Sequence, residues 1–141
     1  MKKIGSISDF KTLRDKELLA RFREELAESR GVPLRDLFGR AARRPASRFW
    51  VSELRAAEVV SKMLKGEETS NPVPQKARMY DEICRRVIEW QEKNPGRPLS
   101  DAVFEAVNST APEFYLTDQS ARVIIYRLIK KRRERNTDNH D

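Results

Sequence analysis

At 141 residues the chain is long enough for one ordinary domain, or for two modules of about 60 residues that would have to share a core. With 38% hydrophobic and 36% charged residues it is too apolar for a disordered chain, and no apolar run approaches the ~18 residues of a membrane span. Lysine and arginine number 29 against 22 aspartate and glutamate, and the net charge of +7 is compatible with a polyanionic partner.

Amphipathic periodicity predicts three helices in the first half of the chain, at residues 9–29, 34–43 and 53–65. Either Ser8 or Thr12 is expected to cap the first helix, and Gly31 to end it, because glycine takes the left-handed turn at low cost. Ser52 is the expected N-cap of the third helix, and Gly66 is expected to terminate it.

Residues 67–75 contain two prolines and no periodicity, and they are interpreted as a linker. Three further helices are predicted after it, at 76–93, at 99–108 and from Thr117 to the end of the basic run near residue 135. Periodicity places Leu26, Leu64 and Ile88 on or near the buried faces of their helices. The polar residues 136–141 are expected to form a disordered tail.

An internal repeat emerges when the sequence is shifted by 65 residues without a gap. Between residues 11–65 and 76–130, 13 of the 55 aligned positions are identical, among them Pro33-Leu34 on Pro98-Leu99. Composition alone predicts helical periodicity in both halves, but not a register carried through two loops. We therefore predict a duplicated unit of three helices.

The best-matched part of the repeat is a five-residue segment, Phe49 to Glu53 in the first copy and Phe114 to Asp118 in the second, which we call the clasp. Each clasp has two aromatic residues, a branched aliphatic residue, a hydroxyl residue suited to capping and an acid for the first helical turn. The two phenylalanines are expected in the core. The second aromatics, Trp50 and Tyr115, suit either core packing, which we favour, or stacking on nucleobases.

These patterns predict an all-α fold of six main helices, built as two tandem three-helix repeats that pack with approximate two-fold symmetry. The first repeat covers residues 9–66, the linker 67–75 and the second repeat 76–135. Neither copy is large enough to be expected to fold stably by itself, so the two are expected to share a core.

The last helix is the principal candidate for a nucleic-acid contact. Glutamine and arginine pair with base edges, and cations meet phosphates. The candidate residues on this helix are Gln119, Arg122, Tyr126, Lys130, Lys131, Arg132 and Arg133. The arrangement is helix-turn-helix-like, but residues 109–116 make a connection longer than the 3 to 4 residues of that motif. The alternative interpretation is a solvated helix end whose cations face the negative end of the helix dipole.

A second cationic cluster lies at the end of the second predicted helix and in the loop that follows it. It comprises Arg40, Arg43, Arg44 and Arg48, where the second copy has Glu105, Asn108, Ser109 and Glu113. The cluster is therefore specific to the first copy. Two basic sites suit contact with successive phosphate runs of a duplex, although loop arginines are also ordinary solubilising residues.

The sequence offers little for catalysis. The single histidine, His140, lies in the predicted tail, so no triad or histidine-based metal site is expected. Cys84 aligns with Leu19 and is interpreted as a small buried hydrophobe. One cysteine permits no internal disulfide, and the N-terminus has no signal-peptide pattern, which favours a cytoplasmic protein without a membrane partner. No cofactor or metal is predicted.

Two functions follow from these patterns, and neither is enzymatic. The first is binding of nucleic acid, with double-stranded DNA preferred, by the last helix and the basic clusters. The alternative is a helical protein-interaction or assembly module that presents Val123, Tyr126 and Leu54 to a partner helix or another subunit.

Overall fold

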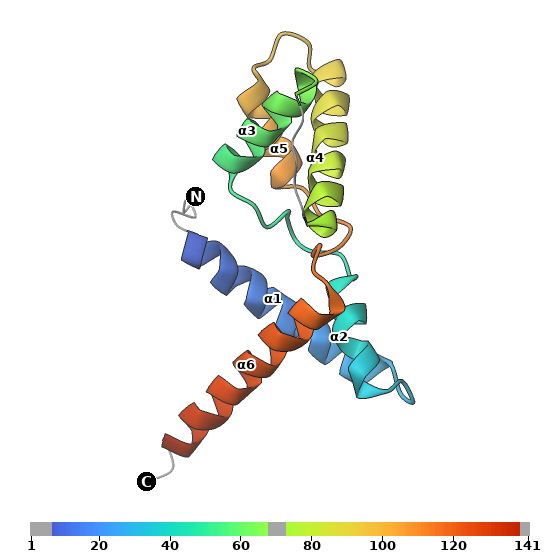
Figure 1. The fold of residues 1–141 in the computed structure, drawn as a ribbon, viewed down its shortest axis with the longest axis vertical. Helices are drawn as coiled ribbons and strands as arrows, with labels where there is room; N and C mark the ends of the chain where they lie inside the picture. The colour runs from blue at the N-terminus through green and yellow to red at the C-terminus, as the bar shows by residue number, and fades with distance from the viewer. Residues whose placement is uncertain (1–6, 68–72, 139–141) are drawn as a thin grey trace. The chain divides into compact units, whose positions relative to one another are not determined.

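The computed structural model describes residues 7–67 and 73–138, and the side chains of 10–67 and 73–135. Within these ranges it has six helices and no strand (Figure 1). The helices are α1 (Ile7–Glu28), α2 (Leu34–Ala42), α3 (Glu53–Leu64), α4 (Pro74–Lys93), α5 (Leu99–Val107) and α6 (Asp118–Asp138). The predicted all-α architecture is confirmed.

Some predicted boundaries and burials differ from the structure. Ser8 and Thr12 both lie inside α1, so neither caps it. α6 continues to Asp138, three residues into the predicted tail, while 139–141 and most of the linker lie outside the described residues. Leu26, Leu64 and Ile88, predicted on buried faces, are exposed. Periodicity identifies the apolar side of a helix, but a neighbouring helix covers only part of that side.

The chain folds into two compact units that are discontinuous in sequence. Unit 1 contains α1, α2 and α6, from the chain up to Arg44 and from Leu116 onward. Unit 2 contains α3, α4 and α5, between Pro45 and Tyr115. The third helix of the chain therefore packs on the fourth and fifth, and the sixth packs on the first two.

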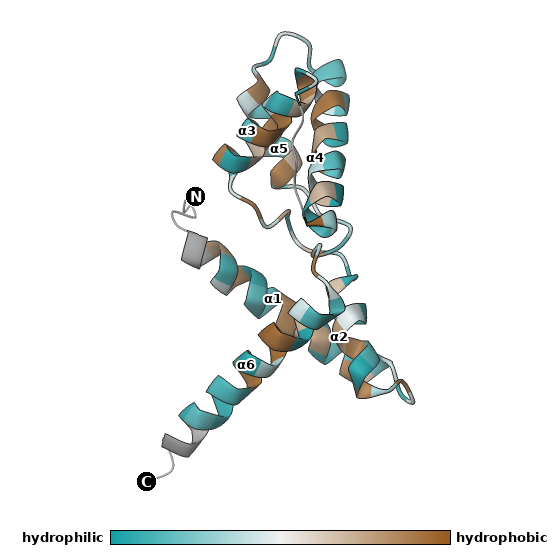
Figure 2. Ribbon diagram, viewed as in Figure 1, coloured by the Kyte–Doolittle hydropathy of each residue, from teal (hydrophilic) through white to brown (hydrophobic). Residues whose placement is uncertain are grey.

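Unit 1 is held by apolar side chains on the facing sides of its three helices. The rings of Phe22 on α1 and Phe38 on α2 stack with their centroids 5.0 Å apart. Leu18 and Ala41 are fully buried, and Ile125 contributes the buried face of α6. Along α6, apolar residues give way to charged ones toward the C-terminus, so only its first half can bury an apolar stripe (Figure 2).

Unit 2 is organised around Phe49, whose ring is 1% exposed and stacks on that of Tyr115 with centroids 6.0 Å apart. The backbones of Ala46 and Ala111 pair reciprocally in an antiparallel bridge, with N–H···O distances of 3.0 and 2.9 Å. Phe114 is also buried. Both clasp phenylalanines are therefore core residues, as predicted.

The predicted caps of the third and sixth helices are confirmed. The Ser52 hydroxyl accepts a hydrogen bond from the Arg55 backbone N–H at 3.1 Å. The Thr117 hydroxyl accepts one from the Ser120 N–H at 3.0 Å. Each bond satisfies an N–H that the first helical turn leaves without an intrahelical partner. Gly31 follows α1 with φ +83°, the left-handed conformation expected at a helix end.

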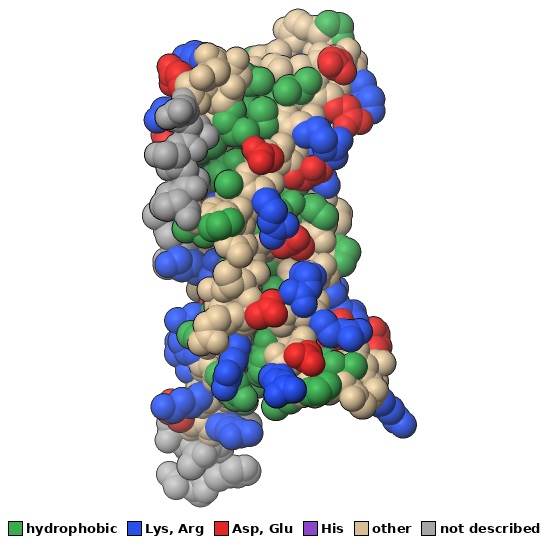
Figure 3. Space-filling model, turned by 45° about the vertical axis from the view of Figure 1, so that its right-hand side comes forward, with side chains coloured by type: hydrophobic (Ala, Val, Ile, Leu, Met, Phe, Trp, Pro, Cys, Tyr) green, Lys and Arg blue, Asp and Glu red, His purple; other side chains and the backbone are tan. Residues whose placement is uncertain are grey.

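Many acidic residues of unit 2 are paired along single helices. Glu89 pairs with Arg85 at 3.1 Å and with Lys93 at 3.2 Å, and Asp101 pairs with Arg97 at 2.8 Å. On the face in Figure 3, cations accordingly lie among carboxylates rather than in one block. These acids are ordinary helix-surface partners, separated by one turn.

Candidate binding groove

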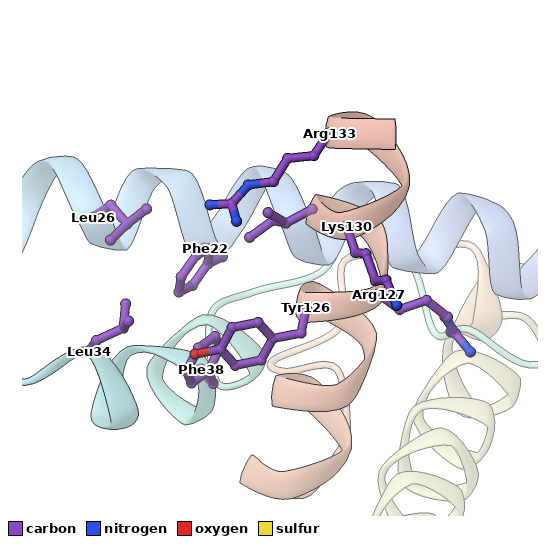
Figure 4. A pocket seen from close by; sticks show the side chains of 9 residues that line it. Phe22, Leu26, Leu34, Phe38, Tyr126, Arg127, Lys130 and Arg133 are labelled. Atoms are coloured by element: carbon purple, nitrogen blue, oxygen red, sulfur yellow. The ribbon is translucent and has the colours of Figure 1, made fainter. Parts of the chain in front are cut away.

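Unit 1 contains a groove of about 540 Å³ between α1, α2 and α6, which we call the α6 groove (Figure 4). Such a volume falls within the range of ligand-binding pockets. The lining side chains are mostly apolar, with cations along the α6 side. They are Phe22, Leu26, Leu34, Phe38, Tyr126, Arg127, Ile129, Lys130 and Arg133.

The floor of the groove is aromatic and rigid. The Phe22 and Phe38 rings are nearly parallel, with an interplanar angle of 6°, and both side chains are buried. Tyr126 reaches over Phe38 from α6, with ring centroids 5.3 Å apart, as Figure 4 shows. Packed aromatic rings have few accessible rotamers, so this floor is preorganised for contact.

The sides of the groove expose large apolar side chains. Leu26 is 48% exposed, Leu34 51% and Tyr126 45%. Leu26 ends the apolar stripe of α1 and Leu34 begins α2, so the two lie on either side of the turn that joins these helices. Single exposed hydrophobic residues are common, but a contiguous set around a concave surface is typical of a binding site.

The α6 side of the groove is cationic. Arg127, Lys130 and Arg133 contribute to the lining, and the lining contains no carboxylate. Arg127 also reaches Asp15 on α1, with Nη2 and Oδ2 3.3 Å apart, and Figure 4 shows its guanidinium directed away from the aromatic floor. An apolar partner that carries negative charge would therefore meet complementary groups along this edge.

The positive charge of the protein belongs to unit 1. The segments that form it hold 19 Lys and Arg against 11 Asp and Glu, whereas residues 45–115 hold 10 against 11. The net charge of +7 is thus an excess of eight on unit 1 and a slight deficit on unit 2. The sequence order hides this division, because unit 1 combines the two ends of the chain.

The arginines of the second predicted cationic cluster bind groups of the protein itself. Arg40 pairs with Glu25 at 3.3 Å, and Arg43 pairs with Asp118 at 2.8 Å. Arg48 belongs to the other unit, where it donates to the backbone oxygens of Phe49 and Val51 at 3.0 and 3.1 Å and lies over the Trp50 ring. Burial lowers the pKa of Arg48, against the raising effect of Glu53.

Arg44 is the most extensively paired member of that cluster. It donates to Glu25 at 2.7 Å, to Glu24 at 2.9 Å and to Glu28 at 2.6 Å, all on α1. Hydrogen bonds to Glu28 and Glu25 raise its pKa. The side chain therefore joins the loop after α2 to three carboxylates of α1, which is a structural role.

Glu25 is a buried acid that the sequence patterns did not identify. Its burial alone would raise its pKa, but hydrogen bonds from Arg44 and Ser29 and the charges of Arg44 and Arg40 outweigh that effect and lower the pKa below its ordinary value of 4.5. Asp15, also buried, is held by Arg14 at 3.0 Å and by Arg127. Both acids lie on α1, where Glu25 binds Arg40 of α2 and Arg44 of the following loop, and Asp15 binds Arg127 of α6.

The structure gathers some predicted site residues and separates others. Tyr126, Lys130 and Arg133 line the α6 groove. Gln119, Arg122, Lys131 and Arg132 are exposed on α6 outside the lining, and the Arg122 guanidinium lies 5.6 Å from the Tyr126 ring centroid. A helix-turn-helix needs its two helices packed on each other, whereas α5 and α6 belong to different compact units.

Six lining residues were not predicted as site residues: Phe22, Leu26, Leu34, Phe38, Arg127 and Ile129. Phe22, Leu26, Leu34 and Phe38 follow helical periodicity, so they resemble core positions. A signal was nevertheless present in the repeat. The second copy has Val87 for Phe22 and Val103 for Phe38, so the large rings are specific to one copy.

The described residues bear on two kinds of chemistry, metal binding and thiol reactivity. They contain no group of three or more metal-ligating side chains, and burial raises the pKa of Cys84, with Asp81 adding to the effect. None of the described helices has the length and apolarity needed to cross a membrane. No protein-family model, curated protein or solved structure matches the chain.

Proposed function

We propose that this protein is a non-enzymatic helical interaction module that binds an apolar segment of a protein partner in the α6 groove. The observation that carries this proposal is the set of half-exposed apolar side chains, Leu26, Leu34 and Tyr126, around the stacked pair Phe22–Phe38. Exposed apolar residues beside preorganised aromatic rings are the usual anchors of protein interfaces. A cytoplasmic location, which the single cysteine favours, belongs to the same proposal.

The difference between the two copies supports the groove as the functional element. The lining residues Phe22, Leu26 and Tyr126 correspond to Val87, Gln91 and Ser61 in the other unit. The core positions Ile124 and Ile125 instead correspond to Val59 and Val60 and keep their apolar character. The aromatic positions of the groove thus differ between the two units, whereas Leu34, Arg127, Ile129 and Lys130 keep the character of Leu99, Lys62, Leu64 and Lys65.

Photo-crosslinking tests the proposal at single positions. With p-benzoylphenylalanine at Leu34, irradiation in the native cell is expected to give a discrete adduct, because this side chain faces the groove and is half exposed. The same substitution at Ile88 on α4 is the matched control, since this side chain is 42% exposed in unit 2. The crosslinked protein is then purified and titrated against the intact chain.

The Leu26→Ala variant is expected to weaken that binding roughly tenfold, because an anchor in a desolvated pocket contributes more than ~1 kcal/mol. Its stability should change little, as Leu26 is exposed. Absence of any discrete adduct at Leu34, or affinity unchanged by Leu26→Ala, contradicts the proposal.

Nucleic-acid binding is the second candidate, and the charge of unit 1 favours it. Lys130, Lys131 and Arg132 are exposed in consecutive positions of α6, followed by Arg133. With the arginines of the other cluster engaged inside the protein, the contact would be with phosphates along α6 rather than with two separate sites.

Replacing residues 130–133 by alanine is expected to abolish most binding to a labelled random-sequence duplex at about 50 mM salt. The slope of the logarithm of the binding constant against the logarithm of the salt concentration should become less negative by roughly one for each lost phosphate contact. Fluorescence anisotropy measures both effects. The control is Lys62→Ala with Lys65→Ala, two exposed lysines at the end of α3. If the unmodified protein does not bind at low salt, this candidate is wrong.

We also propose that the two halves arose by duplication and that each contributes its third helix to the other half's unit. Hydrogen bonds at equivalent positions support this. Arg43 meets Asp118 at 2.8 Å in unit 1, and the equivalent Asn108 meets Glu53 at 3.1 Å in unit 2. In each case the end of a second helix binds the first-turn acid of the other copy's third helix.

The backbone bridge supports the same proposal. Ala46 and Ala111 are equivalent under the 65-residue shift, and each donates its N–H to the other's carbonyl oxygen. Reciprocal pairing of two residues that are equivalent in the repeat is what a duplicated segment predicts. Matched alanine substitutions at Phe49 and Phe114 test this equivalence, and similar losses of stability are expected.

A further inference from the structure

We propose that the partner segment is an acidic amphipathic helix. This inference rests on the proposed docking function of the α6 groove. Its apolar face would cover the Phe22–Phe38 floor, and its carboxylates would meet the cations along α6. The occupant is therefore a helix of another protein with leucine-like anchors and flanking aspartate or glutamate.

The helical form of the partner follows from the walls of the groove. All three walls are helices, and the described residues contain no strand whose edge an extended peptide could join. The one backbone bridge, Ala46 with Ala111, uses both of its N–H groups internally. An additional helix can instead pack its ridges between those of α1 and α6, as in a four-helix arrangement. Its anchors would recur at i, i+3, i+4 and i+7.

The acidic character of the partner follows from the charges around the groove. Three cations contribute to the lining and no carboxylate does. Among the carboxylates of α1, those of Glu24, Glu25 and Glu28 are bound by Arg44, and that of Asp15 is bound by Arg127. Unit 1 as a whole also carries an excess of eight positive charges, the same sign as the cations of the lining. A basic helix would be repelled by this surface, and a neutral one would leave the edge unused.

Lys130 is the cation best placed to contact the partner's carboxylates. It lines the groove one turn after Tyr126 on the same face of α6, whereas its neighbour Lys131 is also exposed but lies outside the lining. The two lysines thus differ in whether they line the groove. Lys130→Glu and Lys131→Glu therefore form a matched pair that separates a local contact from the general field of unit 1.

A displayed library of helical peptides of about 18 residues provides the test. Anchor positions vary among Leu, Ile, Phe and Met, and flanking positions vary among Glu, Gln and Lys. Selection uses the intact protein, with Leu26→Ala as the counter-selection for clones that do not need the groove. Clones that depend on Leu26 are expected to be enriched in Glu over Lys at the flanks.

The best acidic clone is then synthesised and titrated. Lys130→Glu is expected to weaken its binding more than tenfold, and Lys131→Glu no more than about threefold, because only the first removes a direct contact. Leu26-dependent clones without preference for Glu would overturn the acidic partner and leave the docking function standing. If no clone depends on Leu26, both are wrong. Acidic clones that ignore Leu26 would indicate a general polyanion surface and overturn the inference.

Discussion

Replacing Phe49 by alanine is expected to lower the free energy of unfolding by about 4 kcal/mol, the middle of the range for buried phenylalanines. The ring is 1% exposed, stacks on Tyr115 at 6.0 Å and has the Arg86 guanidinium 4.9 Å from its centroid. Its removal leaves a cavity between these groups that the bridged segment around Ala46 and Ala111 cannot easily close. Urea denaturation followed by circular dichroism measures the loss.

Two further variants serve as comparisons for the loss of stability in Phe49→Ala. Phe114→Ala is expected to have a comparable cost, because Phe114 is buried at the equivalent clasp position. Phe104→Ala should cost under about 1 kcal/mol, since Phe104 on α5 is 39% exposed. A Phe49 variant as stable as the Phe104 variant would contradict the anchoring role. A Phe114 variant that resembles Phe104 would count against equivalence of the two clasps.

Helices and their ends were predictable because their signals are local. Ser52 and Thr117 each bind an N–H three residues ahead, so residue type and position suffice to identify them as caps. Gly31 takes its positive φ for an equally local reason. Predictions for α2 to α5 accordingly lie within two residues of the observed bounds.

Which helices the third helix packs on could not be predicted from such local signals. The buried stripe of α3, which includes Ala56, Val59 and Val60, would look the same whether it packed on α1 and α2 or on α4 and α5. Periodicity specifies a face and not the surface that covers it. Tandem order along the chain suggested neighbours in space, but the compact units join α6 to the first two helices.

The groove was missed for a related reason. Leu26 continues the apolar stripe of Leu18, Leu19 and Phe22, so the pattern predicts that it is buried. The stripe is longer than the part of α1 that α2 and α6 cover, and Leu26 lies beyond that part. Conversely, four arginines in a short segment suggested an exposed basic patch. The partners of Arg44 lie 16 to 20 residues upstream and that of Arg43 lies 75 residues downstream, beyond the reach of local patterns.

Replacing Arg44 by methionine is expected to destabilise unit 1 by about 3 kcal/mol at neutral pH. Met keeps much of the side-chain length but removes the donors that hold Glu24, Glu25 and Glu28, and Glu25 is only 5% exposed. Removing one partner of a buried ion pair leaves the other charge without compensation, at a cost of ~3 to 5 kcal/mol. The lower end applies because Arg40 still pairs with Glu25.

The same pair gives a pH dependence with a definite sign. The pKa of Glu25 is lowered in the folded protein, so its contribution is present above the unfolded value of 4.5 and is lost as the pH falls through the folded pKa. Without Arg44 the effect of burial should dominate and raise that pKa. The stability difference between the unmodified protein and Arg44→Met is therefore expected to be largest near pH 7 and to shrink by about pH 3.

Urea denaturation of both proteins at several pH values measures this difference directly. The control is Arg43→Met, whose pair with Asp118 is exposed on both sides, so a loss below about 1 kcal/mol is expected. The double variant Glu25→Gln with Arg44→Met should recover part of the lost stability, because the buried carboxylate has been neutralised. A difference between the unmodified protein and Arg44→Met that stayed constant from pH 7 to pH 3 would show that Glu25 is not the group stabilised by Arg44.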